Sequence, residues 1–431
     1  MIVFAGFVAL SQSIKFGVFN DVHLNLTLHG DCKFPYCYND GEYGFDSDSA
    51  LVDTMMDDMH DQFDASTKID VVVMSGDFVM HGLASTNPSV SNWDLMKETI
   101  QASVDKVKSR FPQAKLMPCI GNNDVVNHYQ APDITQKDQY YADLYNIWFA
   151  NVPSNANYQN LAQIESTFKT GGYYRYDLTE KLTFITLNTI YYSIRNNNDL
   201  QTGNDQLTWL QTQLSTAATS EPNRKFIVQM HIFPGLFYFS GEEQFYRTNY
   251  TSALLAIINS HQNQIQFMLG AHIHWGDIRA PISHEFPDLK VVLLATPSIS
   301  PIFNNNPGYS VLELSDSNNE VTDMKWRFLQ LYSYIFMKYK SFSTIDTEEL
   351  FDIDVNSVDS IRSYVNRQQT DSNFFGVVMT AKLGYNWIFQ QMGGLLFPLG
   401  KMFFMKNIQQ NVLCALKYFE IEDYHNCEYK A

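Results

Sequence analysis

Short apolar runs that end in polar side chains recur along the chain, and they limit its fold more than any other feature. Each of seven runs is five or six residues long, rich in β-branched and aromatic side chains, and bounded by turn residues. This pattern is typical of buried strands. The runs cover residues 14–19, 69–74, 116–120, 182–187, 226–230, 265–269 and 291–295.

Stretches of helical length separate these runs and predict a layered α/β fold. Their periodic apolar positions place helices at 47–63, 92–110, 139–149, 205–214 and 250–261. The pattern changes near residue 347, after which helical stretches at 348–366, 373–391 and 407–418 are no longer separated by strand runs. We therefore expect a main α/β domain at 14–330 and a C-terminal helical region at 331–431.

Potential metal ligands follow five of the predicted strands. Because α/β sheets build their sites at the carboxyl ends of strands, we expect these side chains to meet. Oxygen and imidazole ligands without a thiolate suit Zn, Mn or Fe, and one Asp between two sets of His can bridge two ions. Two ions about 3.5 to 4 Å apart stabilise an in-line displacement at phosphorus. In chain order, the strand-end residues are Asp21, His23, Asp77, Asn122, Asn123, Asp124, His231, His272 and His274.

The charge of the chain limits its partners. The formal net charge is -17, from 29 Lys and Arg against 46 Asp and Glu. Without a cluster of Lys and Arg, such a chain cannot supply the phosphate-neutralising contacts that drive binding to nucleic acid. We therefore exclude nucleic acid as a partner, but not a small anionic substrate held by metal ions.

The first residues predict export. An apolar run at 1–10 precedes the sequence Ser-Gln-Ser, so we expect a signal peptide at 1–13, with a first buried strand as the alternative. The chain would then be secreted or reside in the lysosomal or vacuolar lumen. Two glycosylation sequons, at Asn25 and Asn249, fit that route. No later run is long enough to span a membrane, so we expect peripheral membrane contact at most.

The five cysteines fit an exported enzyme. Cys32 with Cys37, and Cys414 with Cys427, are close enough in sequence to form local disulfides. Cys119 lies in an apolar stretch, where we expect a buried free thiol.

The order D-x-H, G-D, G-N-x-D, H and H-x-H resembles the calcineurin-like metallophosphoesterases. The flanking sequences DVHLNLTLH at 21–29, GDFVMH at 76–81, TLNTIYY at 186–192 and TPSISP at 296–301 narrow the resemblance to the acid sphingomyelinase-like phosphodiesterases. The resemblance runs from about residue 14 to about 330, so that 14–330 would be a catalytic domain. It implies one ion held by Asp21, His23 and His274, a second held by Asn122, His231 and His272, and Asp77 bridging both.

One position departs from the family pattern. The family normally reads G-N-H-D or G-N-H-E, and its His is proposed to help protonate the leaving group, but here the residue is Asn123. An amide cannot act as a general acid, and losing one costs roughly 10²- to 10⁴-fold in rate. His81, four residues after Asp77, matches a histidine that such enzymes place beside the leaving group. His81 as a solvent-exposed loop residue, and His128 as a second candidate acid, are the alternatives.

The resemblance implies a secreted phosphodiesterase with two divalent ions, preferably Zn, with Mn, Fe or Co as alternatives. It would cleave a phosphodiester or phosphoanhydride by attack of metal-bound hydroxide, on a sphingomyelin-like lipid head group or a nucleotide. The G-N-N-D sequence with a nearby His128 also resembles vacuolar endopolyphosphatases, so an endopolyphosphatase or nucleotide phosphohydrolase is one alternative. A metal-binding homologue weakened by Asn123 is another. We expect a monomer whose His29, Asn188 and His128 contact substrate.

Overall fold

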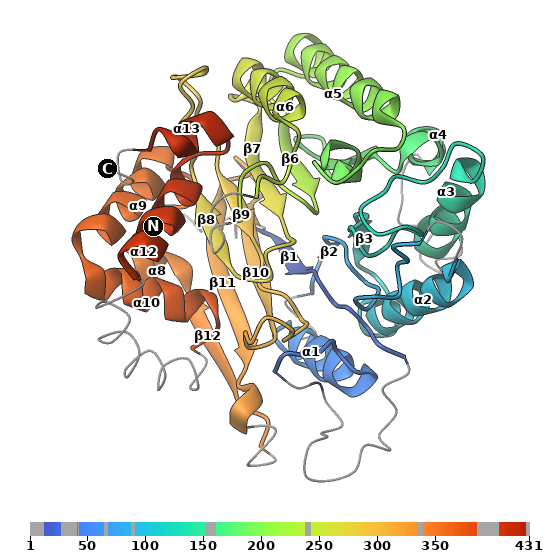
Figure 1. Cartoon of the computed structure of the whole chain (residues 1–431), viewed down its shortest axis with the longest axis horizontal. Coiled ribbons are helices and arrows are strands. Elements are labelled where there is room, and N and C mark those ends of the chain that lie inside the picture. The colour runs from blue at the N-terminus through green and yellow to red at the C-terminus, as the bar shows by residue number, and fades with distance from the viewer. Residues whose placement is uncertain are drawn as a thin grey trace, which may run out of the picture.

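Two six-stranded mixed sheets form the centre of the molecule, and helices surround them (Figure 1). The structure is a computed structural model. It describes residues 13–26, 41, 43–63, 68–87, 91–150, 161–237, 243–333, 339–385 and 405–427. The expected α/β class is confirmed.

The first sheet has the order β12-β11-β10-β1-β2-β3. Its strands β1, β2 and β3 are parallel, whereas β10, β11 and β12 join antiparallel. The bounds are β1 Ser13–Phe19, β2 Val71–Met74, β3 Lys115–Pro118, β10 Gly308–Ser315, β11 Val321–Leu329 and β12 Phe342–Asp346. The sheet therefore continues past the expected domain boundary at residue 330, because β12 pairs with β11.

The second sheet has the order β4-β5-β6-β7-β9-β8. Its four middle strands are parallel, and β4 and β8 are antiparallel at the edges. The bounds are β4 Tyr174–Asp177, β5 Leu182–Leu187, β6 Lys225–Met230, β7 Ile265–Gly270, β8 Asp277–Arg279 and β9 Leu293–Ala295. The two sheets contact each other through Phe16 and Phe184, and the Gln229 amide donates to Met117 O at 3.0 Å.

Burial explains which strands the sequence indicates. The residues of β2 and β5 are all buried, because strands covered on both faces read as continuous apolar runs. By contrast, β10 and β11 alternate between buried and partly exposed residues. Their mixed sequences do not stand out as apolar runs, so the antiparallel half of the first sheet was not expected.

Helices occupy most of the connections between strands. The α1, α2, α3, α5 and α6 helices lie close to the expected stretches. Capping side chains define several of their starts; for example, Asp48 accepts from Leu51 N at 2.7 Å. The helix α4 was not expected. The bounds are α1 Ser49–Asp61, α2 Trp93–Arg110, α3 Lys137–Tyr145, α4 Leu161–Gly171, α5 Leu200–Ser220 and α6 Thr248–His261.

The C-terminal region is helical, as expected, and packs on β8. Buried Lys382 donates to Asp277 at 2.6 Å, and Arg279 donates to Ala415 O at 3.0 Å. The bounds are α8 Thr347–Phe351, α9 Val358–Thr370, α10 Ser372–Lys382, α12 Met405–Lys417 and α13 Ile421–His425. In the described part of the chain, none of the helices has the length and apolar character that crossing a membrane requires.

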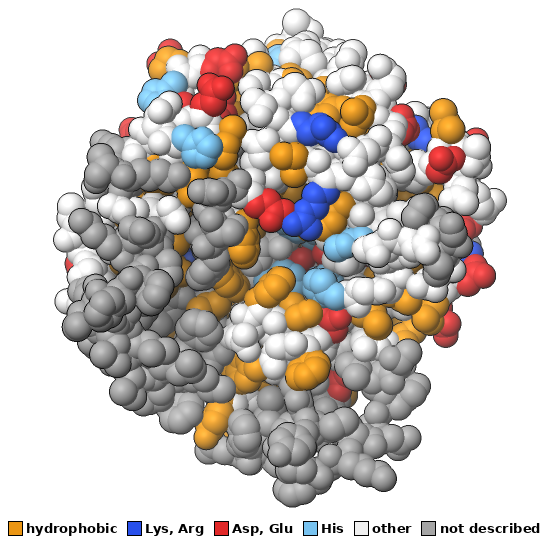
Figure 2. All heavy atoms as spheres, viewed as in Figure 1, with side chains coloured by type: hydrophobic (Ala, Val, Ile, Leu, Met, Phe, Trp, Pro, Cys, Tyr) orange, Lys and Arg blue, Asp and Glu red, His pale blue; other side chains and the backbone are white. Residues whose placement is uncertain are grey.

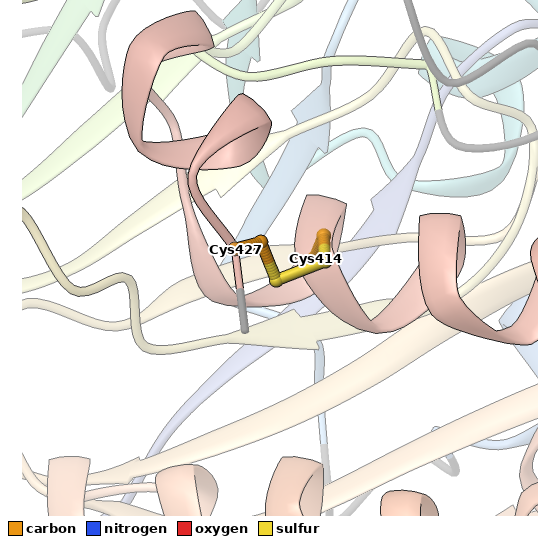
Figure 3. The surroundings of a disulfide bond; sticks show 2 residues. All are labelled: Cys414 and Cys427. Carbon is orange, nitrogen blue, oxygen red and sulfur yellow. A yellow bond between two sulfur atoms is a disulfide. The ribbon is translucent and has the colours of Figure 1, made fainter. Parts of the chain in front are cut away.

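A disulfide joins Cys414 in α12 to Cys427 after α13, which confirms that expected pair (Figure 3). Cys119 is a buried free thiol, also as expected. The pair of Cys32 and Cys37 lies outside the described residues, as do residues 1–12 of the expected signal peptide.

We expect removal of this disulfide to destabilise the chain. The bond closes a loop with a sequence separation of 13 residues, and loops of this size contribute about 2 to 4 kcal/mol by restricting the unfolded chain. Cys414→Ser with Cys427→Ser should lower the free energy of unfolding in urea by that amount. Reduced wild type should match the double variant, and an unchanged midpoint in both would contradict the expectation.

Candidate metal centre

The loops that follow β1, β2, β3, β6 and β7 meet at one edge of the two sheets. His23 Nε2 from the first loop lies 3.2 Å from His274 Nε2 of the last, although the two residues are 251 positions apart. The seven strand-end residues that the family resemblance implies as ligands are all buried or nearly so, and most of them fall into three groups with metal-ligand spacing. These groups are Asp21, His23 and Asp77; His23, His81 and His274; and Asp77, His231 and His272.

Asp77 lies between the two sets of histidines. Its Oδ2 is 3.5 Å from His23 Nε2 and 3.4 Å from His231 Nε2. On the second side, His231 Nε2 lies 3.0 Å from Asn122 Oδ1. A single carboxylate that faces both sets is the arrangement that bridging two ions requires.

The ring orientations fit cation binding. His23 Nδ1 donates to Val79 O at 2.9 Å, and His231 Nδ1 donates to Ser75 O at 2.7 Å. These bonds leave Nε2 of each ring facing the cluster, as second-shell hydrogen bonds do for metal-binding histidines. Asp21 Oδ1 is buried and has no hydrogen-bond donor among the described residues, yet it lies 3.4 Å from His274 Nε2. The residues present therefore fit two divalent ions.

The backbone at the site is strained. Asp21, His23, Asp77, His272 and His274 have φ between 44° and 74°, a left-handed region that non-glycine residues seldom adopt. Such conformations cost of order 1 to 3 kcal/mol each, and they cluster at functional sites. Five of them among seven candidate ligands indicate that the fold is organised around this site.

Close packing between two loops holds Asp77. A Cβ on Gly121 would lie 2.1 Å from Asp77 Oδ1, so only glycine fits there. Asp124 accepts from the backbone N–H groups of Asp77 and Phe78 at 2.8 Å each, and of Gly121 at 2.9 Å. Asp124 thus ties the loop after β3 to the loop after β2.

The electrostatics of the cluster demand positive charge. Burial opposes ionisation of Asp77, but the charges of His231 and His23 hold the pKa of this carboxyl well below its usual value. Burial likewise opposes protonation of His23 and His231, yet the facing carboxylates raise the pKa of each to about 9. Burial lowers the pKa of His272 to about 3. Two buried carboxylates need cationic partners here, and divalent ions would supply them.

His81 lies beside the cluster. Its ring stacks on His23 with centroids 3.9 Å apart, and Nδ1 lies 2.8 Å from Asp46 Oδ1. The His81 backbone N–H also donates to Asp46 Oδ2 at 2.8 Å, so this carboxylate fixes the position of the residue. The sequence did not indicate Asp46, because it belongs to a loop with no motif.

Asn123 faces the bridging carboxylate. Its side-chain Nδ2 donates to Asp77 Oδ2 at 2.8 Å, and its backbone N–H donates to Asp77 Oδ1 at 2.7 Å. His128 Nε2 lies 3.2 Å from Asn122 Nδ2, which places His128 at the edge of the cluster. Asn123 therefore holds Asp77 in the described structure.

The other expected substrate contacts have different surroundings. Asn188 is buried, and its amide donates to Tyr141 OH at 3.1 Å and Gly171 O at 3.0 Å. Its oxygen accepts from Ile190 N at 3.3 Å, so the hydrogen bonds of this side chain lie within the protein. His29 lies outside the described residues.

Comparison with known proteins identifies the family. A family model described as calcineurin-like phosphoesterase matches residues 14–276. The chain is 28% identical over 348 residues to sphingomyelinase phosphodiesterase D of Dictyostelium discoideum, covering 78% of this chain and 73% of that protein. Acid sphingomyelinase-like phosphodiesterase 3b of Mus musculus is 26% identical over 316 residues, covering 68% of this chain and 62% of that protein. An endopolyphosphatase of Schizosaccharomyces pombe is 29% identical over 177 residues, or 39% of this chain and 27% of that protein.

The chain belongs to the calcineurin-like phosphoesterases, because the family model matches more than half of its length. The relatives that it matches include acid sphingomyelinase-like phosphodiesterases and, over a shorter segment, an endopolyphosphatase. The resemblance in the motifs is thus confirmed. The chain spans less than two thirds of the length of the Mus musculus and Schizosaccharomyces pombe proteins. It is a phosphodiesterase with a candidate two-metal site.

Proposed function

We propose that this phosphodiesterase cleaves small phosphodiesters at two divalent ions, preferably zinc, held where its two sheets meet. When bound, the ions would polarise the phosphoryl oxygens and lower the pKa of a water molecule between them. The proposed ligands are Asp21, His23 and His274 for one ion, Asn122, His231 and His272 for the other, and Asp77 for both.

The position of Asp77 carries the proposal. A buried carboxylate oxygen within 3.5 Å of imidazole nitrogens on both sides is placed to bind two cations at once. The orphaned Asp21 Oδ1 supports the same conclusion. Phosphoryl transfer needs such a charged, fixed site, because catalysis there is mostly positioning and charge stabilisation.

His81 is the proposed general acid. Asp46 holds His81 Nδ1, which leaves Nε2 to carry the proton for the departing oxygen. The ring of Phe303 lies 6.3 Å from His81 and 4.5 Å from His274, edge to face, and its side chain is 46% exposed. This exposed apolar surface beside the proposed acid suits an alcohol with an apolar part, such as a lipid, and would allow peripheral membrane contact.

A phosphoanhydride substrate is the second candidate, and Asn123 favours it. Its amide faces Asp77 and supplies no proton. A phosphate leaving group is weakly basic and needs less acid assistance than an alkoxide. The endopolyphosphatase relative supports this candidate, whereas the net charge of -17 weighs against a long polyanion. A homologue weakened by Asn123 is the remaining alternative.

The setting of the enzyme is part of the proposal. We infer a signal peptide at 1–13, a catalytic domain at 14–330 and a C-terminal region at 331–431 that is helical after β12. The disulfide supports an oxidising compartment, either outside the cell or in a lysosomal or vacuolar lumen. Asn249 lies in the first turn of α6 and is exposed, as a glycan site must be. We propose a monomer.

Metal removal and restoration test the function. Chelated protein should lose hydrolysis of bis(p-nitrophenyl) phosphate, and added Zn, Mn or Co should restore it, because the seven proposed ligands act only through the ions. Phosphocholine release from sphingomyelin micelles and phosphate release from ATP or tripolyphosphate would then separate the substrate classes. Full activity in chelated protein of verified zero metal content would refute the proposal.

A further inference from the structure

A cavity of 250 Å³ opens beside His272 and extends to Arg195. Figure 2 shows histidines in a hollow near the middle of this face, with positive and negative side chains next to it. The cavity connects His272, a proposed metal ligand, with the charged side chain of Arg195, which has no role in the proposed function. Its lining also includes Tyr129, Glu243, Phe245 and Phe303.

Arg195 is held toward the metal centre. Its guanidinium lies over the Tyr129 ring, 4.7 Å from the centroid, and Tyr129 OH lies 3.4 Å from His272 Nε2. Gln130 Nε2 donates to Arg195 O at 2.7 Å, which fixes the backbone there. Tyr129 has a φ of 63°, so its backbone is strained at the position that orients this ring.

The charge of Arg195 is available to a ligand. Among the described residues that line the cavity, it is the single Lys or Arg. Its ion partner Glu243 lies at the rim, and the two side chains are 49% and 45% exposed. Exposed ion pairs are weak, so an incoming anion can displace Glu243 at little cost. A phosphate monoester can accept two parallel hydrogen bonds from the guanidinium, as a carboxylate can, and it carries more negative charge than Glu243, which makes it the stronger partner.

The same geometry opposes a choline group. A quaternary ammonium binds the open face of an aromatic ring, but the guanidinium already covers Tyr129. A second cation in this cavity would also meet the positive charge of Arg195.

We propose that Arg195 is a specificity-determining residue that binds a second anionic group, such as a further phosphate, carried by the substrate on the His272 side of the centre. The inference rests on the proposed function and narrows its substrate class to phosphodiesters or phosphoanhydrides with such a group. The proposed acid, His81, lies in the group with His274, whereas Arg195 lies near His272. The two residues would therefore contact different parts of the substrate.

Two esters with the same leaving group test it. The p-nitrophenyl ester of thymidine 5′-phosphate and its analogue with an added 3′-phosphate differ by one anionic group. We expect wild type to prefer the analogue in kcat/KM, and Arg195→Gln to reduce kcat/KM on it by ~10- to 100-fold, with little change on the simpler ester. The variant should gain activity on p-nitrophenyl phosphorylcholine.

Arg367→Gln is the matched control, because that guanidinium also lies over an aromatic ring, Phe374, but on α9 outside the cavity. It should keep the wild-type preference. Equal losses on both esters in Arg195→Gln would overturn the inference.

Binding separates this inference from the proposed function. Calorimetric Kd values for thymidine 3′,5′-bisphosphate and thymidine 5′-phosphate, measured on zinc-loaded protein, give the contribution of Arg195 to binding without turnover. A preference for the bisphosphate that disappears in Arg195→Gln supports the inference even if no ester is hydrolysed, in which case the proposed function alone fails. No preference in wild type overturns the inference, whatever the hydrolysis.

Discussion

Asp77→Ala is expected to abolish hydrolysis of bis(p-nitrophenyl) phosphate. Deleting one transition-state donor in an enzyme costs about 10²- to 10³-fold in kcat, and Asp77 is proposed to hold both ions, so we expect a loss above ~10³-fold. Its Oδ2 lies within 3.5 Å of Nε2 of both His23 and His231, closer than Asp21 Oδ1, which lies 3.7 and 3.9 Å from the same two nitrogens. Steady-state kinetics with saturating metal, together with metal content per chain, measure the effect.

Asp105→Ala on α2 is the control, because this carboxylate is exposed and far from the cluster in the fold. It should retain full activity and metal content. Circular dichroism and thermal unfolding should show that Asp77→Ala still folds. A folded Asp77→Ala protein with near-normal turnover would exclude this carboxylate from the centre and remove the main support for the proposed function. His272→Ala should give a loss of the same kind.

His81→Ala is expected to slow substrates with poor leaving groups far more than nitrophenyl esters. Nitrophenolate departs without a proton, whereas an alkoxide needs one, so the expected loss is roughly 10²- to 10⁴-fold on an alkyl phosphodiester and small on the nitrophenyl one. The measurement is kcat on both substrates with the same protein and metal. Equal losses on the two would refute the acid assignment.

Asp46→Asn refines this test. The amide keeps the size of the side chain but removes the charge that faces His81 Nδ1 at 2.8 Å. We expect the same dependence on the leaving group at a smaller amplitude, about 10- to 100-fold, as for other residues that orient a functional histidine. His60→Ala, an exposed histidine at the end of α1, should change neither substrate. An Asp46→Asn protein with wild-type ratios would show that His81 is oriented by other contacts.

The candidate ligands were predictable because strand ends are local features. Each of the parallel strands reads as an apolar run, and the polar residues directly after it lie at one edge of the sheets. This rule placed His23 and His274 in one site across 251 positions, and they lie 3.2 Å apart. The antiparallel strands β10 to β12 were not expected, because one face of each meets solvent and their sequences mix apolar with polar residues.

Other functional positions depend on contacts between loops and carry no sequence signal. Asp46 reaches His81 because the loop around Ser47 pairs with Leu24, and Leu24 in turn pairs with Val79. The amide of Asn188, an expected substrate contact, donates to Tyr141 OH and Gly171 O in the described structure. In both cases the outcome depends on which way a side chain turns after the strands have packed.

The sequence alone determined the α/β class, the kinds of metal ligand and their order along the chain. Strand periodicity and the residues at strand ends are local features, because each depends only on a short segment of the sequence. Tertiary structure decided that Asp77 faces both sets of histidines, that Asn123 holds Asp77, and that Arg195 lies over Tyr129 near His272. These relations join loops from different strands. Their geometry is set by the packing of two sheets, which no single segment encodes.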